Sequence, residues 1–209
     1  MRGKMRLFWL IFAVLFAAAA GFACFYASLF GSIYNQPEGD PGETVTRFFD
    51  SVRNGNYVSA YACLSDYVTL GLERTPETPE AAQLYDALRR SYHYQLDGAC
   101  TVNGLDATQR VRFEALNIRR TESAVAGLVN GILEQKVAEL PDSEVYDGNG
   151  GYLSSLTDAV YTEALNQALQ NTDGLTAETT LEIQLKYMNG GWYMVTDRSL
   201  MNALVGGES

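Results

Sequence analysis

Histidine and cysteine are scarce in this sequence, with one His and three Cys among 209 residues. Structural zinc sites are built from clusters of these side chains, and the sequence contains no such cluster. No glycine-rich phosphate loop follows a predicted strand either. The sequence therefore indicates no metal site and no cofactor.

Basic residues are also few, since 15 Lys and Arg stand against 25 Asp and Glu, a formal net charge of −10. Three of the bases lie within the first six residues, so the rest of the chain carries 12 bases against 25 acids, or −13. An acidic surface repels nucleic acid and anionic lipid head groups. We therefore expect no nucleic acid among the partners.

One long segment, residues 7–30, has no charged side chain. As a helix its 24 residues would span about 36 Å, more than a hydrocarbon core of about 30 Å. Basic residues flank it only on the N-terminal side, which is typical of the cytoplasmic side. We predict a cytoplasmic tail (1–6), a single-pass transmembrane signal anchor (7–30), a linker (31–40) and an extracytoplasmic domain (41–206) at the cell membrane.

Two processing events are alternatives to an intact anchor. Residues 17–20 are all Ala and could form a signal-peptide cleavage site, although the apolar run continues to Phe30. Cys24 could be lipidated, although Phe25 and Tyr26 follow it where a polar stretch would be expected. Both alternatives remain open at the level of sequence.

The outer part changes between helical and strand periodicity. Apolar residues three or four apart predict helices over residues 41–53, 57–64, 79–91, 121–140, 152–170 and 199–204. Alternation predicts strands over residues 92–96, 111–118, 181–187 and 192–196, with residues 99–102 continuing the first strand past a bend at Gly98 and Asn189-Gly190 as the strongest hairpin signal. Asp40 and Thr121 stand where helix N-caps are expected. This order favours an α+β fold, with helices packed on a curved antiparallel sheet of about four strands.

Both ends of the outer part resemble nuclear transport factor 2-like domains. At one end, residues 45–61 read VTRFFDSVRNGNYVSAY, an amphipathic helix, an Asn-Gly break and a Tyr-x-x-Ala-Tyr helix. At the other, Gly191-Trp192-Tyr193-Met194-Val195 followed by Leu200 and Leu204 is similar to the last strand and closing helix of extracytoplasmic members. The resemblance implies a curved sheet wrapped around a long helix to form a pocket. The helices of residues 121–170 depart from the family pattern and look like a two-helix insertion.

The family includes isomerases and dehydratases as well as non-enzymatic modules, so the fold does not decide the function. Isomerase-type members use a buried acid aided by Tyr or His, and the candidates on strands here are Glu114, Glu182, Asp97 and His93. Glu114 and Glu182 alternate with apolar neighbours and should face water. His93 lacks an identifiable partner, so we expect a structural role for it and no enzymatic activity.

A glycine-rich loop carries Asp142, Glu144, Asp147 and Asn149, but its spacing is not that of a calcium-binding EF-hand loop, and we expect a solvated loop. Outside the apolar run, Cys63 and Cys100 either form a disulfide or are buried separately. Most strand aromatics should be core. Some could line a pocket or partner surface, and the candidates are Tyr92, Tyr94, Phe113, Tyr187 and Trp192.

These observations favour a membrane-anchored, non-enzymatic binding or interaction module. Its partner would be another envelope protein, a peptide or a small apolar ligand, in addition to the membrane that holds residues 7–30. One alternative is a structural subunit of an envelope or conjugative secretion complex. A third is a small-molecule isomerase or hydratase.

Overall fold

The computed structural model describes residues 37–66, 73 and 76–207. The predicted tail, the predicted membrane helix of residues 7–30 and most of the linker lie outside these residues. Within the described part, no helix is both long and apolar enough to cross a bilayer. In chain order the elements are α2 (Pro41–Arg53), α3 (Tyr57–Tyr61), α4 (Pro79–Arg90), β1 (His93–Leu96), β2 (Thr101–Asn103), β3 (Asp106–Leu116), α5 (Ile118–Glu139), α6 (Asp142–Val145), α7 (Ser154–Gln170), β4 (Thr176–Met188), β5 (Gly191–Met194) and α8 (Arg198–Leu204).

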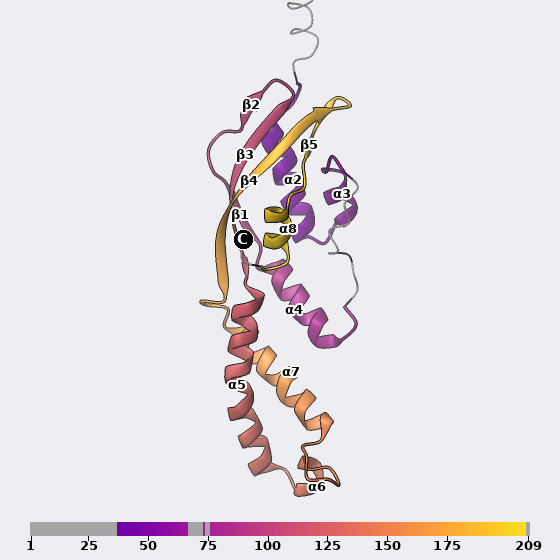
Figure 1. Ribbon diagram of the computed structural model, residues 1–209, viewed down its shortest axis with the longest axis vertical. Helices are drawn as coiled ribbons and strands as arrows, with labels where there is room; N and C mark the ends of the chain where they lie inside the picture. Colours follow the sequence, from indigo (N-terminus) through magenta and orange to yellow (C-terminus); the bar gives the residue numbers. More distant parts are fainter. Residues whose placement is uncertain (1–36, 67–72, 74–75, 208–209) are drawn as a thin grey trace, which may run out of the picture.

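The predicted α+β class is confirmed, with helices against a curled antiparallel sheet (Figure 1). The strand order is β1-β3-β4-β5, and β2 also pairs with β3. Strand β4 pairs with every residue of β3 along one edge, and β1 and β2 share the other edge of β3. The break between them falls at Gly98, whose φ is +79°, and the buried side chain of Gln109 donates a hydrogen bond to its carbonyl oxygen.

The hairpin predicted at Asn189-Gly190 joins β4 to β5. Both residues have positive φ, 52° and 80°, as a type I′ turn requires. The pairing of Met188 with Gly191 leaves these two residues as the whole loop. The prediction from sequence is therefore confirmed at this turn.

The main core lies between one face of the sheet and helices α2 and α8. Asp40 caps α2 by accepting a hydrogen bond from the Gly42 amide at 2.8 Å, and Pro41 occupies the first turn, as predicted. Residues of β3 alternate between exposed and buried, so one face enters the core. The largest fully buried apolar side chains of this main core are Phe48, Phe49, Phe113, Leu116, Leu181, Leu185, Met194, Leu200 and Leu204. We call the sheet with α2, α3 and α8 the body.

The predicted two-helix insertion stands where a turn between β3 and β4 would otherwise be. These strands pair from Asp106 opposite Lys186 to Leu116 opposite Thr176, and α5, α6 and α7 connect their ends. In Figure 1, α5 and α7 run side by side away from the sheet and α6 lies at the far tip. We call residues 118–170 the arm. Its separate core consists of Val125, Ile132, Val145, Leu156, Val160, Ala164, Leu165 and Ala168.

Several predicted boundaries were wrong. Helix α5 begins at Ile118 because Asn117, and not Thr121, is its N-cap, and the Thr121 hydroxyl instead donates to the Asn117 carbonyl oxygen. Helix α3 ends at Tyr61, because the chain beyond it pairs with Met194 of β5. Strand β4 begins five residues earlier than predicted, at Thr176, because the longer β3 offers it a partner. The glycine-rich loop contains the short helix α6.

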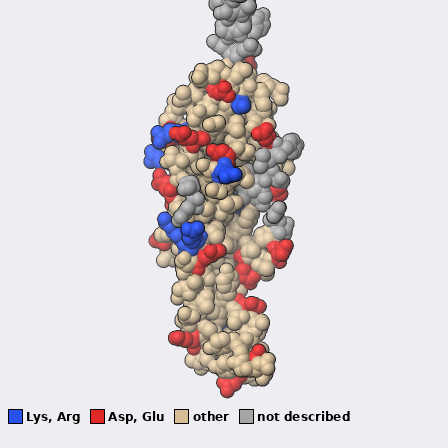
Figure 2. Space-filling view, in the orientation of Figure 1, with Lys and Arg blue, Asp and Glu red and all other residues tan. Residues whose placement is uncertain are grey.

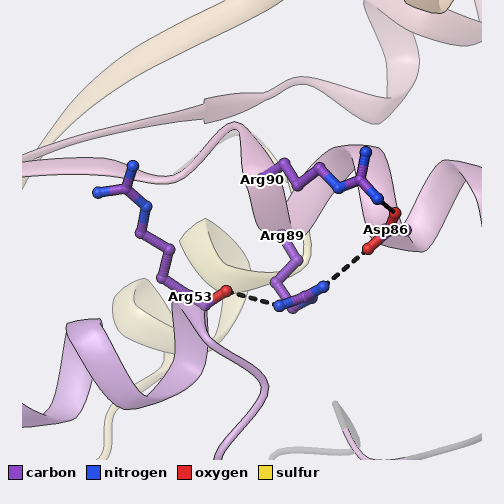
Figure 3. Close-up of polar contacts among 4 residues, drawn as sticks. All are labelled: Arg53, Asp86, Arg89 and Arg90. Atoms are coloured by element: carbon purple, nitrogen blue, oxygen red, sulfur yellow. Dashed lines mark hydrogen bonds and ion pairs between the residues drawn. The ribbon is translucent and has the colours of Figure 1, made fainter.

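Helix α4 connects the body to the arm. On the body side, Arg89 donates to the Arg53 carbonyl oxygen at the end of α2 at 2.7 Å and to Asp86 at 2.8 Å, while Arg90 also pairs with Asp86 (Figure 3). A cation at this position also complements the negative end of the α2 dipole. Leu84, on the same helix, packs against both hydrophobic cores. The position of α4 is therefore fixed from the body.

Candidate binding surfaces

The ligand pocket that the family resemblance implies is largely filled. The sheet face that would form it is covered by α2 and α8, whose Phe48, Phe49, Leu200 and Leu204 are at most 1 % exposed. What remains is a hollow of about 320 Å³ at the start of α5, lined by Phe113, Asn117, Arg120, Glu178 and Gly206 among others.

Hydrogen bonds to backbone carbonyl oxygens cross the region of this hollow. Arg120 donates to the Thr176 carbonyl oxygen at 2.8 Å, and the Ile118 amide donates to the Gly206 carbonyl oxygen at 3.1 Å. Gly206 has φ of +69°, and a Cβ at this position would come within 2.5 Å of the Leu116 carbonyl oxygen. The last residues of the domain are thus closely packed against the root of the arm.

Three of the five aromatics predicted for a pocket or partner surface lie in the core instead. Tyr92, Phe113 and Trp192 are 2 %, 1 % and 5 % exposed. The polar atoms of Tyr92 and Trp192 form hydrogen bonds within the protein. The Tyr92 hydroxyl donates to the Leu204 carbonyl oxygen, and the Trp192 indole donates to the Gly39 carbonyl oxygen. Phe113 alone keeps an edge on the hollow beside α5. These three therefore belong to the core, where most strand aromatics were expected, because the pleat turns them toward α2 and α8. Their assignment to a pocket or partner surface stays a prediction.

The other two aromatics, Tyr94 and Tyr187, are half-buried. Tyr94 stacks on Phe49 with ring centroids 5.0 Å apart and donates to the Asp50 carboxylate at 2.8 Å. Burial and this hydrogen bond raise the pKa of Tyr94 to about 12. Tyr187 lies edge-on to Trp192 at 5.4 Å. Both serve packing at the rim of the core.

Two of the four candidate acid or base groups come together. His93 of β1 stands directly opposite Glu114 of β3, and both line a hollow of about 480 Å³ with Asp86 and Arg90 of α4. Each is held by a structural contact, His93 Nδ1 by the Ser91 carbonyl oxygen at 2.9 Å and Glu114 by the Thr176 hydroxyl at 2.6 Å. His93 is exposed and Glu114 half-buried. Neither lies in an enclosed apolar cavity.

The remaining two candidates lie elsewhere on the sheet. Glu182 is exposed, as expected for a residue that alternates with apolar neighbours, and stands opposite Arg110. Asp97 lies 3.9 Å from Arg110 and 3.7 Å from Arg112. These acids belong to a charged outer surface, and the structure does not bring them to His93.

The two cysteines outside the apolar run are free thiols with different neighbours. Cys63 is buried and donates to the Ser59 carbonyl oxygen at 3.3 Å, while its sulfur accepts from Arg47. Cys100 is half-buried and donates to the Thr108 carbonyl oxygen at 3.3 Å. Burial and the nearby Asp40 carboxylate raise the pKa of the Cys100 thiol, so it is poorly nucleophilic. In the structure the two thiols are separate, and each bonds a backbone carbonyl oxygen of its own surroundings.

In the acidic loop at the tip of the arm, the Asp147 carboxylate forms hydrogen bonds with the loop's own backbone. Asp147 accepts hydrogen bonds from the amides of Asn149 and Gly151, at 2.8 and 2.9 Å. Across the described residues, no group of three or more His, Cys, Asp or Glu is arranged to hold a metal ion. Tyr146 and Tyr152 pair across the base of the loop, with rings stacked at 5.6 Å.

The sequence analysis missed a groove between α4 and α7. Its volume is about 490 Å³, and it is lined by Thr78, Pro79, Glu80, Ala81, Leu84, Asp158, Tyr161 and Leu165. Leu84, Leu165 and Tyr161 give it an apolar floor, and Glu80 and Asp158 place two carboxylates on its wall. Tyr161, a large aromatic beside the buried stripe of α7, is 44 % exposed at this groove, a property that the sequence alone does not show.

Contacts between α4 and α7 hold the two sides of this groove together. The Thr162 hydroxyl donates to Glu80 at 2.9 Å, and Gln83 donates to Asn166. Hydrogen bonds from its own backbone and from Thr162 lower the pKa of Glu80, so this side chain is ionised at neutral pH. The groove is therefore a formed feature between two fixed helices.

The surface of the arm differs in charge from that of the body. Residues 137–170 contain six Asp and Glu and no Lys or Arg. Figure 2 shows the far half of the arm in red and tan alone, whereas blue side chains lie over the body and the root of the arm. The arm also carries Tyr146, Tyr152 and Tyr161, which are 40–47 % exposed. Exposed aromatics on an acidic surface are suited to a partner that is basic and partly apolar.

No protein-family model matches this chain, and no curated protein does. Among solved structures it is similar to that of a Bacillus subtilis protein described as a "putative lipoprotein (ycdA)", with 15 % sequence identity and a TM-score of 0.36. The match covers 87 % of this chain and 54 % of the other, so the chain spans about half the length of that protein. At this level of similarity no family follows, and the resemblance to nuclear transport factor 2-like domains stays a prediction.

Proposed function

We propose that this protein is a non-enzymatic interaction module held at the outer face of a cell membrane by residues 7–30, and that the arm is its partner-binding part. The observation that carries the proposal is the distribution of exposed side chains: the outer part of the arm, residues 137–170, combines exposed aromatics with six acids and no Lys or Arg. Exposed aromatic residues that the chain itself does not cover are typical of interaction sites.

The shape of the molecule supports the same proposal. Within the part that the structure describes, the first residues lie at one end and α6 lies at the other (Figure 1). With the chain anchored through its N-terminal segment, the tip of the arm would be the part farthest from the membrane. The 22 residues of α5 alone extend about 33 Å.

The packing of the body supports a binding function over the isomerase alternative. The sheet face that would hold a substrate is occupied by core side chains from α2 and α8. His93 and Glu114 instead line an open hollow and take part in structural hydrogen bonds. A projecting arm would also suit the structural subunit of an envelope complex, in which case the partner would be a neighbouring subunit.

Photo-crosslinking in intact cells tests the proposal. A benzophenone amino acid would replace Tyr146 or Tyr161 on the arm, and Thr180 or Gln184 on the exposed face of β4 as matched controls. We expect discrete protein adducts from the arm positions alone, and protease added to whole cells should remove the domain. Adducts from the β4 positions without any from the arm would overturn the assignment of the arm, and a protease-resistant domain would overturn the topology.

A further inference from the structure

The groove between α4 and α7 offers apolar surface and negative charge in one place. Leu84 and Leu165 form its floor, and Tyr161 presents a ring that remains 44 % exposed. The floor is continuous with both hydrophobic cores, because Leu84 contacts each of them. Covering this surface would remove apolar area from water, at about 25 cal/mol per Å².

Among the residues that the structure describes, no base forms an ion pair with the carboxylates of the groove. Glu80 receives its hydrogen bonds from neutral groups, its own backbone and Thr162. Asp158 is exposed, and within the described residues neither carboxylate has an ion pair. The bases of α4, Arg89 and Arg90, pair with Asp86, and Lys136 of α5 pairs with Glu163 of α7. A ligand that supplies a cation would therefore find two available acceptors.

The geometry of the groove limits the form of this ligand. Two helices meet here at an angle, and their facing residues follow helical spacing, with Asp158, Tyr161 and Leu165 on α7 and Ala81 and Leu84 on α4. An amphipathic helix that lays its apolar stripe into such a groove is a common mode of peptide recognition. Long Lys and Arg side chains can bury their stems while their charged ends reach carboxylates, and a guanidinium or ammonium group also binds the face of an aromatic ring.

We propose that the groove between α4 and α7 binds a basic amphipathic helical segment of a partner protein. Its apolar side chains contact Leu84, Leu165 and Tyr161, and its Lys or Arg side chains reach Asp158 and Glu80. This inference rests on the proposed function of the arm and names the chemistry of its partner. Charge complementarity disfavours a second copy of this chain, because copies would bring two acidic arms together.

A site-specific probe in the full-length protein tests this inference. The chain is placed in nanodiscs of zwitterionic lipid, with 3-fluorotyrosine at position 161 and, in a second sample, at position 193 on the body. The ligand is a synthetic helical peptide of Leu and Lys in amphipathic order, compared with a scrambled Leu/Lys peptide and with a Leu/Glu peptide. We expect a saturable change in the ¹⁹F shift at position 161 with the ordered Leu/Lys peptide alone, and none at position 193.

Two charge reversals locate the binding. Asp158→Lys should raise the titration midpoint about tenfold, because it replaces an attraction by a repulsion at the groove. Glu134→Lys makes the same change in net charge on the outer face of α5 and should alter the midpoint by less than about twofold. Circular dichroism confirms that both variants are folded.

Several outcomes would overturn the inference. Equal effects of the two reversals would mean that the peptide binds by general charge attraction and not at the groove. An equal response to the scrambled peptide would mean that binding does not need an amphipathic helix. A concentration-dependent shift without peptide would identify a second copy as the occupant, and failure of the peptide to shift the ¹⁹F signal would leave the groove closed to such a ligand. Arm-specific cross-links that persist in Asp158→Lys cells would show that the partner does not bind at the groove, while the proposed function stands. Absence of any arm cross-link in the unmodified chain would refute the proposed function itself.

Discussion

The body and the arm bury their apolar side chains by different means. In the body a sheet face is covered by two helices, so Phe48, Phe49 and Phe113 are almost fully enclosed. In the arm only two long helices meet, and Leu128, Val129, Leu133 and Val137 stay half-buried. A two-helix layer cannot enclose its own core as a sheet with helices can. The difference indicates that the body supplies stability and that the arm keeps apolar surface available for contact.

The largest effect is expected from Phe49→Ala in the body. Phe49 is 1 % exposed and its ring lies 5.0 to 5.4 Å from those of Phe48, Tyr94 and Phe113. Its removal should cost about 3–5 kcal/mol of unfolding free energy. Urea denaturation followed by tryptophan fluorescence, with Trp9 replaced by Phe so that Trp192 alone reports, measures this loss. The control Thr180→Ala, on the exposed face of β4, should stay within about 0.5 kcal/mol, and a loss for Phe49→Ala no larger than that would contradict the proposed core.

A smaller and local effect is expected from Leu156→Ala in the arm. Leu156 is 5 % exposed within the separate core between α5 and α7. We expect a loss of about 2–3 kcal/mol, confined to the arm. Hydrogen exchange should quicken in α5 and α7 while β3 and β4 stay protected, and the neighbouring Ser155→Ala should change neither. Equal acceleration in β3 and β4 would mean that body and arm unfold as one unit.

High pH should weaken the body through Tyr94. The folded pKa of about 12 lies above the ordinary value of 10, so the stabilisation is fully present below pH 10 and is lost as the pH rises toward about 12. Burial and the hydrogen bond to Asp50 both favour the neutral phenol. Unfolding free energy measured across this range should fall less steeply in Tyr94→Phe. An unchanged slope would remove Tyr94 as a cause.

The junction of body and arm should respond to Asn117→Ala by about 1 kcal/mol. The Asn117 side chain accepts from the Arg120 amide at 2.9 Å and caps α5. Exchange in the first turn of α5 is the appropriate measurement. Asn117→Asp, which keeps the accepting oxygen, should retain most of the protection, and an equal loss in both variants would assign the effect to something other than capping.

The smallest effect is expected for Lys136→Met, which removes the ion pair between the two arm helices. Lys136 Nζ and Glu163 are 2.7 Å apart, but both side chains are partly exposed, at 29 % and 42 %. Such surface pairs contribute about 0–1 kcal/mol and weaken with salt. Thermal unfolding of the arm at low and high salt should differ little from the unmodified chain. A loss above about 2 kcal/mol would show that the arm depends on charge more than on packing.

Elements with strong local signals could be predicted from the sequence. Asp40-Pro41 placed the start of α2 and Asn189-Gly190 placed a hairpin, because caps and type I′ turns depend on the residues themselves. The N-cap of α5 was misplaced at Thr121, since Asn117 follows an apolar strand and gives a cap signal only once that strand is known to end there. The extent of β4 likewise depends on its partner β3.

The candidate surface was harder to predict than the fold. Strand alternation predicts which residues share a face, but whether helices cover that face depends on tertiary packing, so the sequence could not show that Tyr92, Phe113 and Trp192 lie almost fully within the core. The groove joins residues that are far apart in sequence, as the 82-residue separation of Glu80 and Thr162 shows. Only the lack of bases in residues 137–170 was visible in advance, as composition without a location.

Insertion of the arm into a hairpin also has a mechanical consequence. Strands β3 and β4 run into it at Leu116 and Thr176, and the Asn117 amide bonds the Leu175 carbonyl oxygen just beyond them. A sideways force on α6 would therefore turn the whole arm about its root. The resulting torque would reach the sheet through the two adjacent ends of β3 and β4. Helix α4, which is tied to α7 by Glu80 and Gln83 and to α2 by Arg89, is the strut that opposes this rotation.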